Sequence, residues 1–201
     1  MVKTMKSSLR VMTVTAMLAG VASVLMILEF PLPIFPEFLK MDFSELPALI
    51  GAFSFGPVAG VTIVLLKNAI HLTVTTTGGV GELANFIVGA ALVLPAGMVY
   101  RFRKTRGGAL LGMGIGVFTM AFVGIFANYY ITVPFFTRVM VPEEVLIGIC
   151  AAIIPAVDSL WKVVLLSITP FNLLKGVSIG LITFLTYKRL SWLIHGRAAK
   201  S

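Results

Sequence analysis

The sequence contains few charged residues, two histidines and one cysteine. Of its 201 residues, 12% are charged and eight are acidic. Soluble domains carry about 25% charged residues, so this content excludes an ordinary soluble domain. The single cysteine, Cys150, excludes a disulfide within the chain. Because it lies in an apolar run, we expect it to be a small core residue.

The sequence also lacks the motifs of common enzymes and of metal or nucleotide sites. It contains no His-Glu-x-x-His motif, no phosphate-binding glycine loop and no paired carboxylates within an apolar segment. We therefore predict no enzymatic activity, no metal site and no bound cofactor. An ATP-driven process would need a partner protein.

Apolar residues make up 58% of the chain, and its mean hydropathy is +1.02. This predicts an all-α polytopic membrane protein, because a helix needs about 20 apolar residues to cross a bilayer. We predict a single transmembrane substrate-binding domain over residues 1–201, built as a bundle of six helices. The first span resembles a secretory signal, but a retained span is favoured because the rest of the chain is also apolar. The predicted spans cover residues 8–28, 43–55, 58–74, 82–100, 107–133 and 169–192.

Basic residues are concentrated in the two tails and in segment 101–106, which six spans would place on one side of the membrane. All eight acidic residues then fall towards the other side. Excess Lys and Arg marks the cytoplasmic side, so we predict that both termini are cytoplasmic. This topology accounts for the net charge of +8, so the charge does not indicate that the chain binds nucleic acid. The tail residues used are Lys3, Lys6, Arg10, Lys188, Arg189, Arg197 and Lys200, and His195 lies in the same C-terminal tail.

Two connections stand out from the spans. Segment 29–39 contains three prolines, which end the first helix, together with more Phe, Leu and Ile than a solvated loop needs. We expect this segment to be a lid that lies on the protein or over a cavity. Between the last two spans we expect a long mixed connection from Pro134 to Pro170, with a helix that starts at 142–144.

Polar residues gather where the spans reach the non-cytoplasmic side. Ionisable residues at membrane depth are costly and usually face an interior or a water-filled cavity, so their convergence predicts a binding site there. Aromatic side chains of the lid and of segment 129–136 would supply apolar walls, which suits a neutral, ring-bearing small molecule. Asp158 and Lys162 are expected to form a surface ion pair. The other polar groups are Lys40–Glu45, Lys67–His71, Glu82 with Asn85, Asn128 with Thr132, and Asn172 with Lys175.

Small residues line one face of the first span and of the fifth. Small side chains let helices approach closely in lipid. In the first span, two interpretations stay open: tight packing within the chain, or a docking face for another protein. In the fifth span the glycines predict a ridge against a neighbouring helix. The residues are Ala16, Ala19, Gly20 and Ser23 in the first span, and Gly108, Gly112 and Gly116 in the fifth.

Five stretches together resemble the S components of energy-coupling-factor (ECF) vitamin transporters, most nearly the riboflavin-specific S component. The resemblance spans nearly the whole chain. It is strongest in the Asp-Phe-Ser-x-Leu-Pro and Phe-Asn-Leu-Leu-Lys stretches. The stretches are Glu29-Phe-Pro-Leu-Pro, Lys40-Met-Asp-Phe-Ser-Glu-Leu-Pro-Ala-Leu-Ile-Gly, Leu66-Lys-Asn, Gly78-Gly-Val-Gly-Glu-Leu-Ala-Asn-Phe and Pro170-Phe-Asn-Leu-Leu-Lys-Gly.

The resemblance implies a six-helix membrane subunit that binds riboflavin from outside, under a loop between its first two spans. It implies a prokaryotic cell membrane, a transmembrane coupling subunit and two cytoplasmic ATPase subunits as partners. The family's Ala-x-x-x-Ala docking face reads here Ala16-x-x-x-Gly20 or Ala19-x-x-x-Ser23.

By the same resemblance, Asn128 and Lys175 would hold the polar edge or the ribityl hydroxyls of the flavin. Further contacts are expected from Asp42, Lys67, Asn68, Glu82 and Asn85, and the polar grouping adds Thr132 and Asn172. The alternatives are an S component for a different vitamin and a membrane scaffold that transports nothing.

Overall fold

The computed structural model describes the backbone of residues 2–195 and the side chains of residues 9–186. Within this range the chain is mostly helical, which confirms the predicted helical class. Several Lys and Arg residues on which the predicted orientation depends have side chains outside the described residues: Lys3, Lys6, Lys188, Arg189, Arg197 and Lys200.

The first half of the chain forms a long helix, a short strand pair and two helical hairpins. Gly56 joins the first hairpin with a φ of +103°, which glycine adopts without strain. The elements are α1 (Val2–Ile27), β1 (Phe30–Pro31), β2 (Lys40–Met41), α2 (Glu45–Phe55), α3 (Pro57–His71), the 3₁₀ turn Leu72–Val74, α4 (Val80–Phe102) and α5 (Arg106–Ala127).

The second half contains two long, interrupted helices with a short helix between them. The elements are the π-helical turn Asn128–Thr132, α6 (Val133–Phe135), the π-helical turn Phe136–Met140, α7 (Glu143–Ile153), α8 (Leu160–Lys162), the π-helical turn Val163–Ile168 and α9 (Thr169–His195). The start of α7 at Glu143, capped by Pro142, confirms the helix predicted at 142–144.

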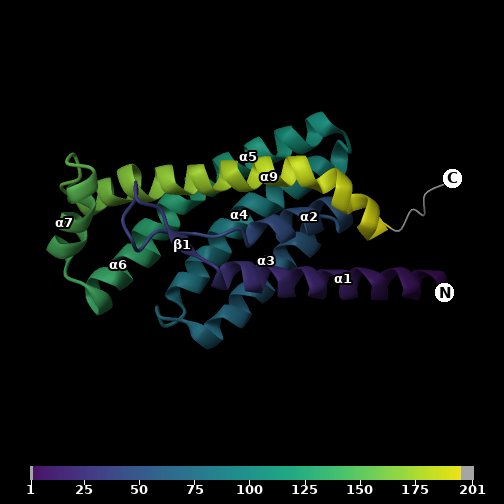
Figure 1. Cartoon of the computed structure of the whole chain (residues 1–201), viewed down its shortest axis with the longest axis horizontal. Coiled ribbons are helices and arrows are strands. Elements are labelled where there is room, and N and C mark those ends of the chain that lie inside the picture. The colour runs from purple at the N-terminus through teal and green to yellow at the C-terminus, as the bar shows by residue number, and fades with distance from the viewer. Residues whose placement is uncertain (1, 196–201) are drawn as a thin grey trace.

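The molecule is elongated along its helices (Figure 1). The start of α1, the α4–α5 connection and the end of α9 lie at one end, and α7 lies at the other. The strand pair β1–β2 lies nearer to the α7 end, beside the interrupted helices. The basic segment 101–106 therefore shares an end with both terminal helices, as the predicted orientation requires.

Among the residues that the structure describes, five helical segments are long and apolar enough to cross a membrane. They are Leu9–Ile27, Pro57–Val74, Val80–Phe102, Arg106–Met140 and Leu160–Thr186. Helix α2 is apolar but has 11 residues, most of which are buried, so it lies within the bundle. A count of six spans stays a prediction.

The prediction of a mixed connection from Pro134 to Pro170 is wrong at both ends. The helix that contains Pro134 continues to Met140, and the helix that contains Pro170 already begins at Leu160. Proline normally ends a helix because its ring clashes with the carbonyl four residues earlier. A π-helical turn precedes each of these prolines, and its wider backbone gives the ring room.

The glycine ridge of α5 packs against α4, as predicted. A Cβ atom at Gly116 would lie 2.4 Å from the carbonyl oxygen of Leu92, and one at Gly112 would lie 2.7 Å from that of Ala96. Only glycine permits this approach. The close α4–α5 contact fixes the far ends of both helices, where the polar residues lie.

A second apolar core lies under the β1–β2 connection, apart from the main core of the bundle. It contains Leu39 and Met41 from the β1–β2 segment and Phe171 from α9. Cys150 is fully buried in it, as its apolar surroundings predicted. This core attaches the Pro-rich segment to the interrupted helices.

Candidate functional site

The Pro-rich segment, residues 29–41, folds into a lid held at its base and along its length. At the base, the Lys40 ammonium lies 2.6 Å from the Glu29 carboxylate, and β1 pairs with β2. Along the lid, the Phe35 ring meets Phe171 edge-on at 5.4 Å between centroids. The apolar side chains that a solvated loop would not need are therefore the ones that attach the lid to α9.

A cavity of about 340 Å³ lies beneath the lid. Its walls come from the lid, the α3–α4 connection, α5 with its π-helical turn, and α9. Ligand pockets for drug-sized molecules measure about 300–1,000 Å³. The residues predicted to bind substrate that line it are Asp42, Glu82, Asn85, Asn128, Thr132, Asn172 and Lys175.

Buried charges of both signs form one wall of the cavity. Glu45 accepts from Lys67 at 2.5 Å with one carboxylate oxygen and lies 3.5 Å from Lys175 with the other. Asp42 accepts from Lys175 at 2.6 Å. Buried charges are tolerated when they are paired, and here two carboxylates balance two ammonium groups. This cluster ties the lid base, α2, α3 and α9 together.

The protonation state of Asp42 follows from its partners. Burial by itself would raise the pKa of its carboxyl, but the charges of Lys175 and Lys67, together with the hydrogen bonds from Lys175 and Ser44, outweigh burial and hold that pKa well below its usual range. The Asp42 side chain also accepts a hydrogen bond from the backbone N–H of Ser44 at 2.8 Å. Asp42 is therefore an anion at neutral pH.

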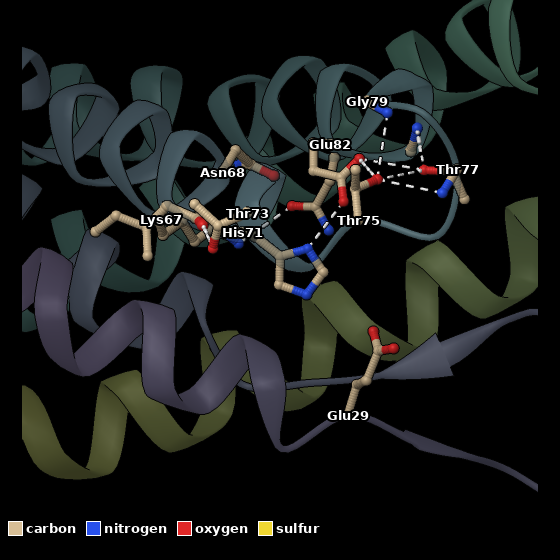
Figure 2. Close-up of polar contacts among 12 residues, drawn as sticks. Glu29, Lys67, Asn68, His71, Thr73, Thr75, Thr77, Gly79 and Glu82 are labelled. Atoms are coloured by element: carbon tan, nitrogen blue, oxygen red, sulfur yellow. Dashed lines mark hydrogen bonds and ion pairs between the residues drawn. The ribbon is translucent and has the colours of Figure 1, made fainter.

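A second polar cluster surrounds Glu82 at the start of α4 (Figure 2). The carboxylate lies 2.9 Å from Nδ1 of His71 and accepts hydrogen bonds from Thr75 at 2.8 Å and Thr77 at 3.1 Å. In Figure 2 the imidazole projects from Glu82 towards the side on which Glu29 of the lid lies. Both Glu29 and His71 line the cavity, so ionisable groups of the lid and of α3 lie in its wall.

Amide and hydroxyl groups line the remaining polar wall. Asn128 donates to the Gly124 carbonyl at 2.7 Å, which fixes its side chain, and Asn172 lies on the facing helix. The Thr132 hydroxyl is buried without a hydrogen-bond partner among the described residues. Buried polar groups are normally satisfied, so this hydroxyl is an exception in the wall of the cavity.

The structure separates the predicted site residues into two groups. Lys67 and Asn68 are buried but do not line the cavity: Lys67 binds Glu45 and Asn85, and Asn68 donates to the Val64 carbonyl. The prediction did not include Glu45 among the substrate-binding residues, although Glu45 lines the cavity. Its position three residues after Asp42, in a strongly apolar segment, was the available signal.

The small-residue face of α1 divides in the same way. Ala19 and Ser23 are buried against the chain, with 2% and 6% of their surface exposed. Ala16 and Gly20 are exposed, and a Cβ atom at Gly20 would meet nothing within 4 Å among the described residues. Ala19 and Ser23 thus pack within the chain, whereas Ala16 and Gly20 face outward. Docking of another protein on the outward residues stays a prediction.

Comparison with known proteins covers nearly the whole chain. Residues 10–187 match the family described as "ECF transporter, substrate-specific component". The chain is 31% identical to the riboflavin transporter RibU of Staphylococcus aureus (strain TCH60), over 93% of each chain. It is 30% identical to the riboflavin transporter FmnP of Bacillus subtilis (strain 168), over 94% of this chain and 96% of the relative.

A solved structure has the same fold. Its report is called "Structure and mechanism of the S component of a bacterial ECF transporter". The two chains are 29% identical and superpose with a TM-score of 0.73, over 93% of this chain and 98% of the other.

Proposed function

The chain belongs to the family of ECF transporter substrate-specific components, and from this premise we propose that it binds riboflavin for an ATP-driven vitamin importer. It is a multi-pass protein of the cell membrane. The observation that carries the proposal is the lidded cavity, whose walls are apolar and aromatic with a few fixed polar groups. Its relatives that are named riboflavin transporters align with this chain over almost their full length.

The cavity suits a flat, uncharged ring system with hydroxyl groups. Phe38, Phe136 and Phe171 supply apolar surface, on which a ring system can stack. Asn128, Asn172 and Lys175 offer donors and acceptors to the carbonyl and N–H groups of the ring edge, or to the ribityl hydroxyls. An ammonium carries three N–H groups, and Asp42 and Glu45 take up at most two of those of Lys175.

Transport would use the outward face of α1. Riboflavin enters from the side opposite the cytoplasm and is covered by the lid. The loaded subunit docks through Ala16 and Gly20 on a transmembrane coupling subunit, because small exposed residues let a second helix approach closely. Two cytoplasmic ATPase subunits drive the movement that opens the cavity inward, since the chain itself has no phosphate-binding loop.

A fluorescence titration tests the proposal directly. Purified protein, freed of bound flavin, is added to riboflavin, whose fluorescence should be quenched as the ring stacks on aromatic side chains. We expect saturable quenching at or below about 1 μM, as for a specific small-molecule site. Competition between riboflavin and other vitamins in the same assay tests the alternative that the chain is an S component for a different vitamin. No quenching at micromolar protein would contradict the riboflavin assignment.

A further inference from the structure

An open groove of about 540 Å³ lies on the outer surface of α5, apart from the cavity beneath the lid. All of its lining residues are exposed, so no other part of the described chain covers it. A Cβ atom at Gly114 would meet nothing within 4 Å among the described residues, so the packing of the protein does not require glycine there. The residues that line the groove are Gly107, Leu110, Leu111, Gly114, Ile115 and Phe118.

The groove begins beside the basic segment 101–106. Arg106 is the first residue of α5 and directly precedes the first residue of the groove. Residues four apart are neighbours on a helix surface, so Arg106 lies beside Leu110 of the groove. The connection is held in place because the Thr105 hydroxyl accepts from the Gly108 N–H at 3.0 Å. The fold therefore fixes a group of cations at one end of an apolar groove.

The cations of this segment have no carboxylate partner among the residues whose side chains the structure describes. The acidic residue before them in the sequence, Glu82, lies in the first turn of α4, at the opposite end of that helix, and the one after them, Glu143, begins α7. Phe102, between two of the cations, is 83% exposed. Exposed apolar side chains among Lys and Arg are typical of segments that lie in a membrane interface. The cations are Arg101, Arg103, Lys104 and Arg106.

We propose that this surface binds an anionic phospholipid of the leaflet on the side of the two terminal helices. The headgroup phosphate contacts the basic segment 101–106, and one acyl chain lies in the groove. From Gly107 to Phe118 the groove is about 16 Å long, at a rise of about 1.5 Å per residue. One leaflet of a hydrocarbon core of about 30 Å is about 15 Å thick, so an acyl chain matches the groove in length. A soluble anion would contact the cations but leave the groove unused.

Native mass spectrometry of the purified full-length chain tests the headgroup contact. The added lipids are dioleoylphosphatidylglycerol and dioleoylphosphatidylcholine, which have the same chains, but only the first carries a net charge. We expect the wild-type protein to bind the anionic lipid more tightly. Arg106→Gln should weaken that binding about fivefold, because a cation near a membrane surface contributes about this factor, and Arg106→Lys should preserve it. Arg138→Gln, which removes an exposed cation from the turn before α7, is the matched control.

A second pair of variants tests the groove itself. Gly114→Leu places a side chain in the groove without meeting another part of the described chain, so it should displace the acyl chain and weaken binding of the anionic lipid severalfold. Gly148→Leu adds the same side chain at an exposed position of α7, where a Cβ atom also meets nothing within 4 Å among the described residues. It should leave lipid binding unchanged.

Several outcomes would overturn the proposal. They are equal binding of the two lipids by the wild-type protein, equal effects of Arg106→Gln and Arg138→Gln, and equal effects of Gly114→Leu and Gly148→Leu. A dimer that only Gly114→Leu dissociates would assign the groove to a second copy of the chain. Displacement of the lipid by soluble glycerophosphate at equal concentration would show that the headgroup alone is recognised. None of these results would affect the binding of riboflavin proposed above.

Discussion

Asp42 lies at the base of the lid, and its carboxylate forms an ion pair with Lys175 of the last helix. This ion pair joins the lid to that helix. Breaking a buried pair leaves the other charge uncompensated, which costs about 3–5 kcal/mol. We expect Asp42→Asn to lower the free energy of unfolding by an amount of this order, measured by thermal unfolding in detergent. Asp158→Asn, which breaks an exposed pair, should have a much smaller effect, because water screens an exposed pair. Equal effects of the two changes would contradict a structural role of the buried pair.

The pH dependence of stability follows from the same pair. The pKa of Asp42 is lowered in the folded protein, so its contribution to stability is fully present above the unfolded pKa of about 4. That contribution is lost progressively as the pH falls below about 4 and through the lower folded pKa. Wild-type protein should therefore lose stability more steeply below about pH 4 than Asp42→Asn does. Parallel stability profiles of the two proteins would refute this.

Because Gly124 has no side chain, there is room beside it for the amide groups of Asn172 and Asn128. A Cβ atom there would lie 3.0 Å from the amide nitrogen of Asn172 and 3.9 Å from that of Asn128. Gly124→Ala should therefore displace the Asn172 amide and weaken riboflavin binding about tenfold with little loss of stability. Gly114→Ala, where a Cβ atom meets nothing within 4 Å among the described residues, is the matched control. Unchanged affinity in the first variant would show that Asn172 does not position the ligand.

At the level of residues, the sequence allowed the burial of polar side chains to be predicted. It did not allow the partners of those side chains to be predicted equally well. Asp42, Lys67 and Lys175 were all recognised as unusual in an apolar chain, and all three are buried. Spacing along one helix could not show that Lys67 binds Glu45, because that contact joins two helices across Gly56. Pairing between helices depends on how they pack, which local pattern does not encode.

At the level of elements, the π-helical turns set the direction of the polar side chains that follow them. The turn Val163–Ile168 precedes Pro170, and Asn172 and Lys175 lie within the next two turns of α9. Pro170→Ala removes the ring that requires a wider backbone, so the turn should relax towards α-helix and rotate these side chains. We expect about tenfold weaker riboflavin binding, measured by fluorescence titration, with an unchanged melting temperature.

Pro142→Ala is the control for that experiment, because Pro142 caps α7 and does not line the cavity. Equal affinities of both proline variants would contradict the proposed role of the π-helical turn. Pro134 and Pro170 also explain the misplaced helix ends: a proline usually indicates the end of a helix, and here each follows a π-helical turn that the sequence pattern does not predict.

The exposed register of α1 gives a second prediction for an element. Gly20→Leu fills the outward face and should prevent the chain from co-purifying with its coupling subunit, while riboflavin binding stays at the wild-type level. Val21→Leu changes a neighbouring exposed residue and should leave the complex intact. Loss of the complex in both variants, or in neither, would argue against docking through Ala16 and Gly20.

At the level of the whole molecule, the predicted orientation can be tested by labelling. Cys150 is fully buried and should contribute little background. We expect Glu37→Cys in the lid to react with an impermeant thiol reagent in intact cells, and Lys104→Cys in the α4–α5 connection to react only after permeabilisation. The opposite pattern would reverse the membrane orientation and place the cavity on the cytoplasmic side.

The shared carboxylate of Glu45 also has a consequence for how the chain is inserted during synthesis. Its partner Lys67 lies 22 residues away, in the same helical hairpin, whereas Lys175 lies 133 residues after Asp42. A lone charge at the centre of a helix costs about 2.5–3.5 kcal/mol on insertion. The α2–α3 hairpin can enter the bilayer as an electrically neutral unit, long before Lys175 is made. Lys175 then enters with the last helix, when its partner Asp42 is already present at the base of the lid.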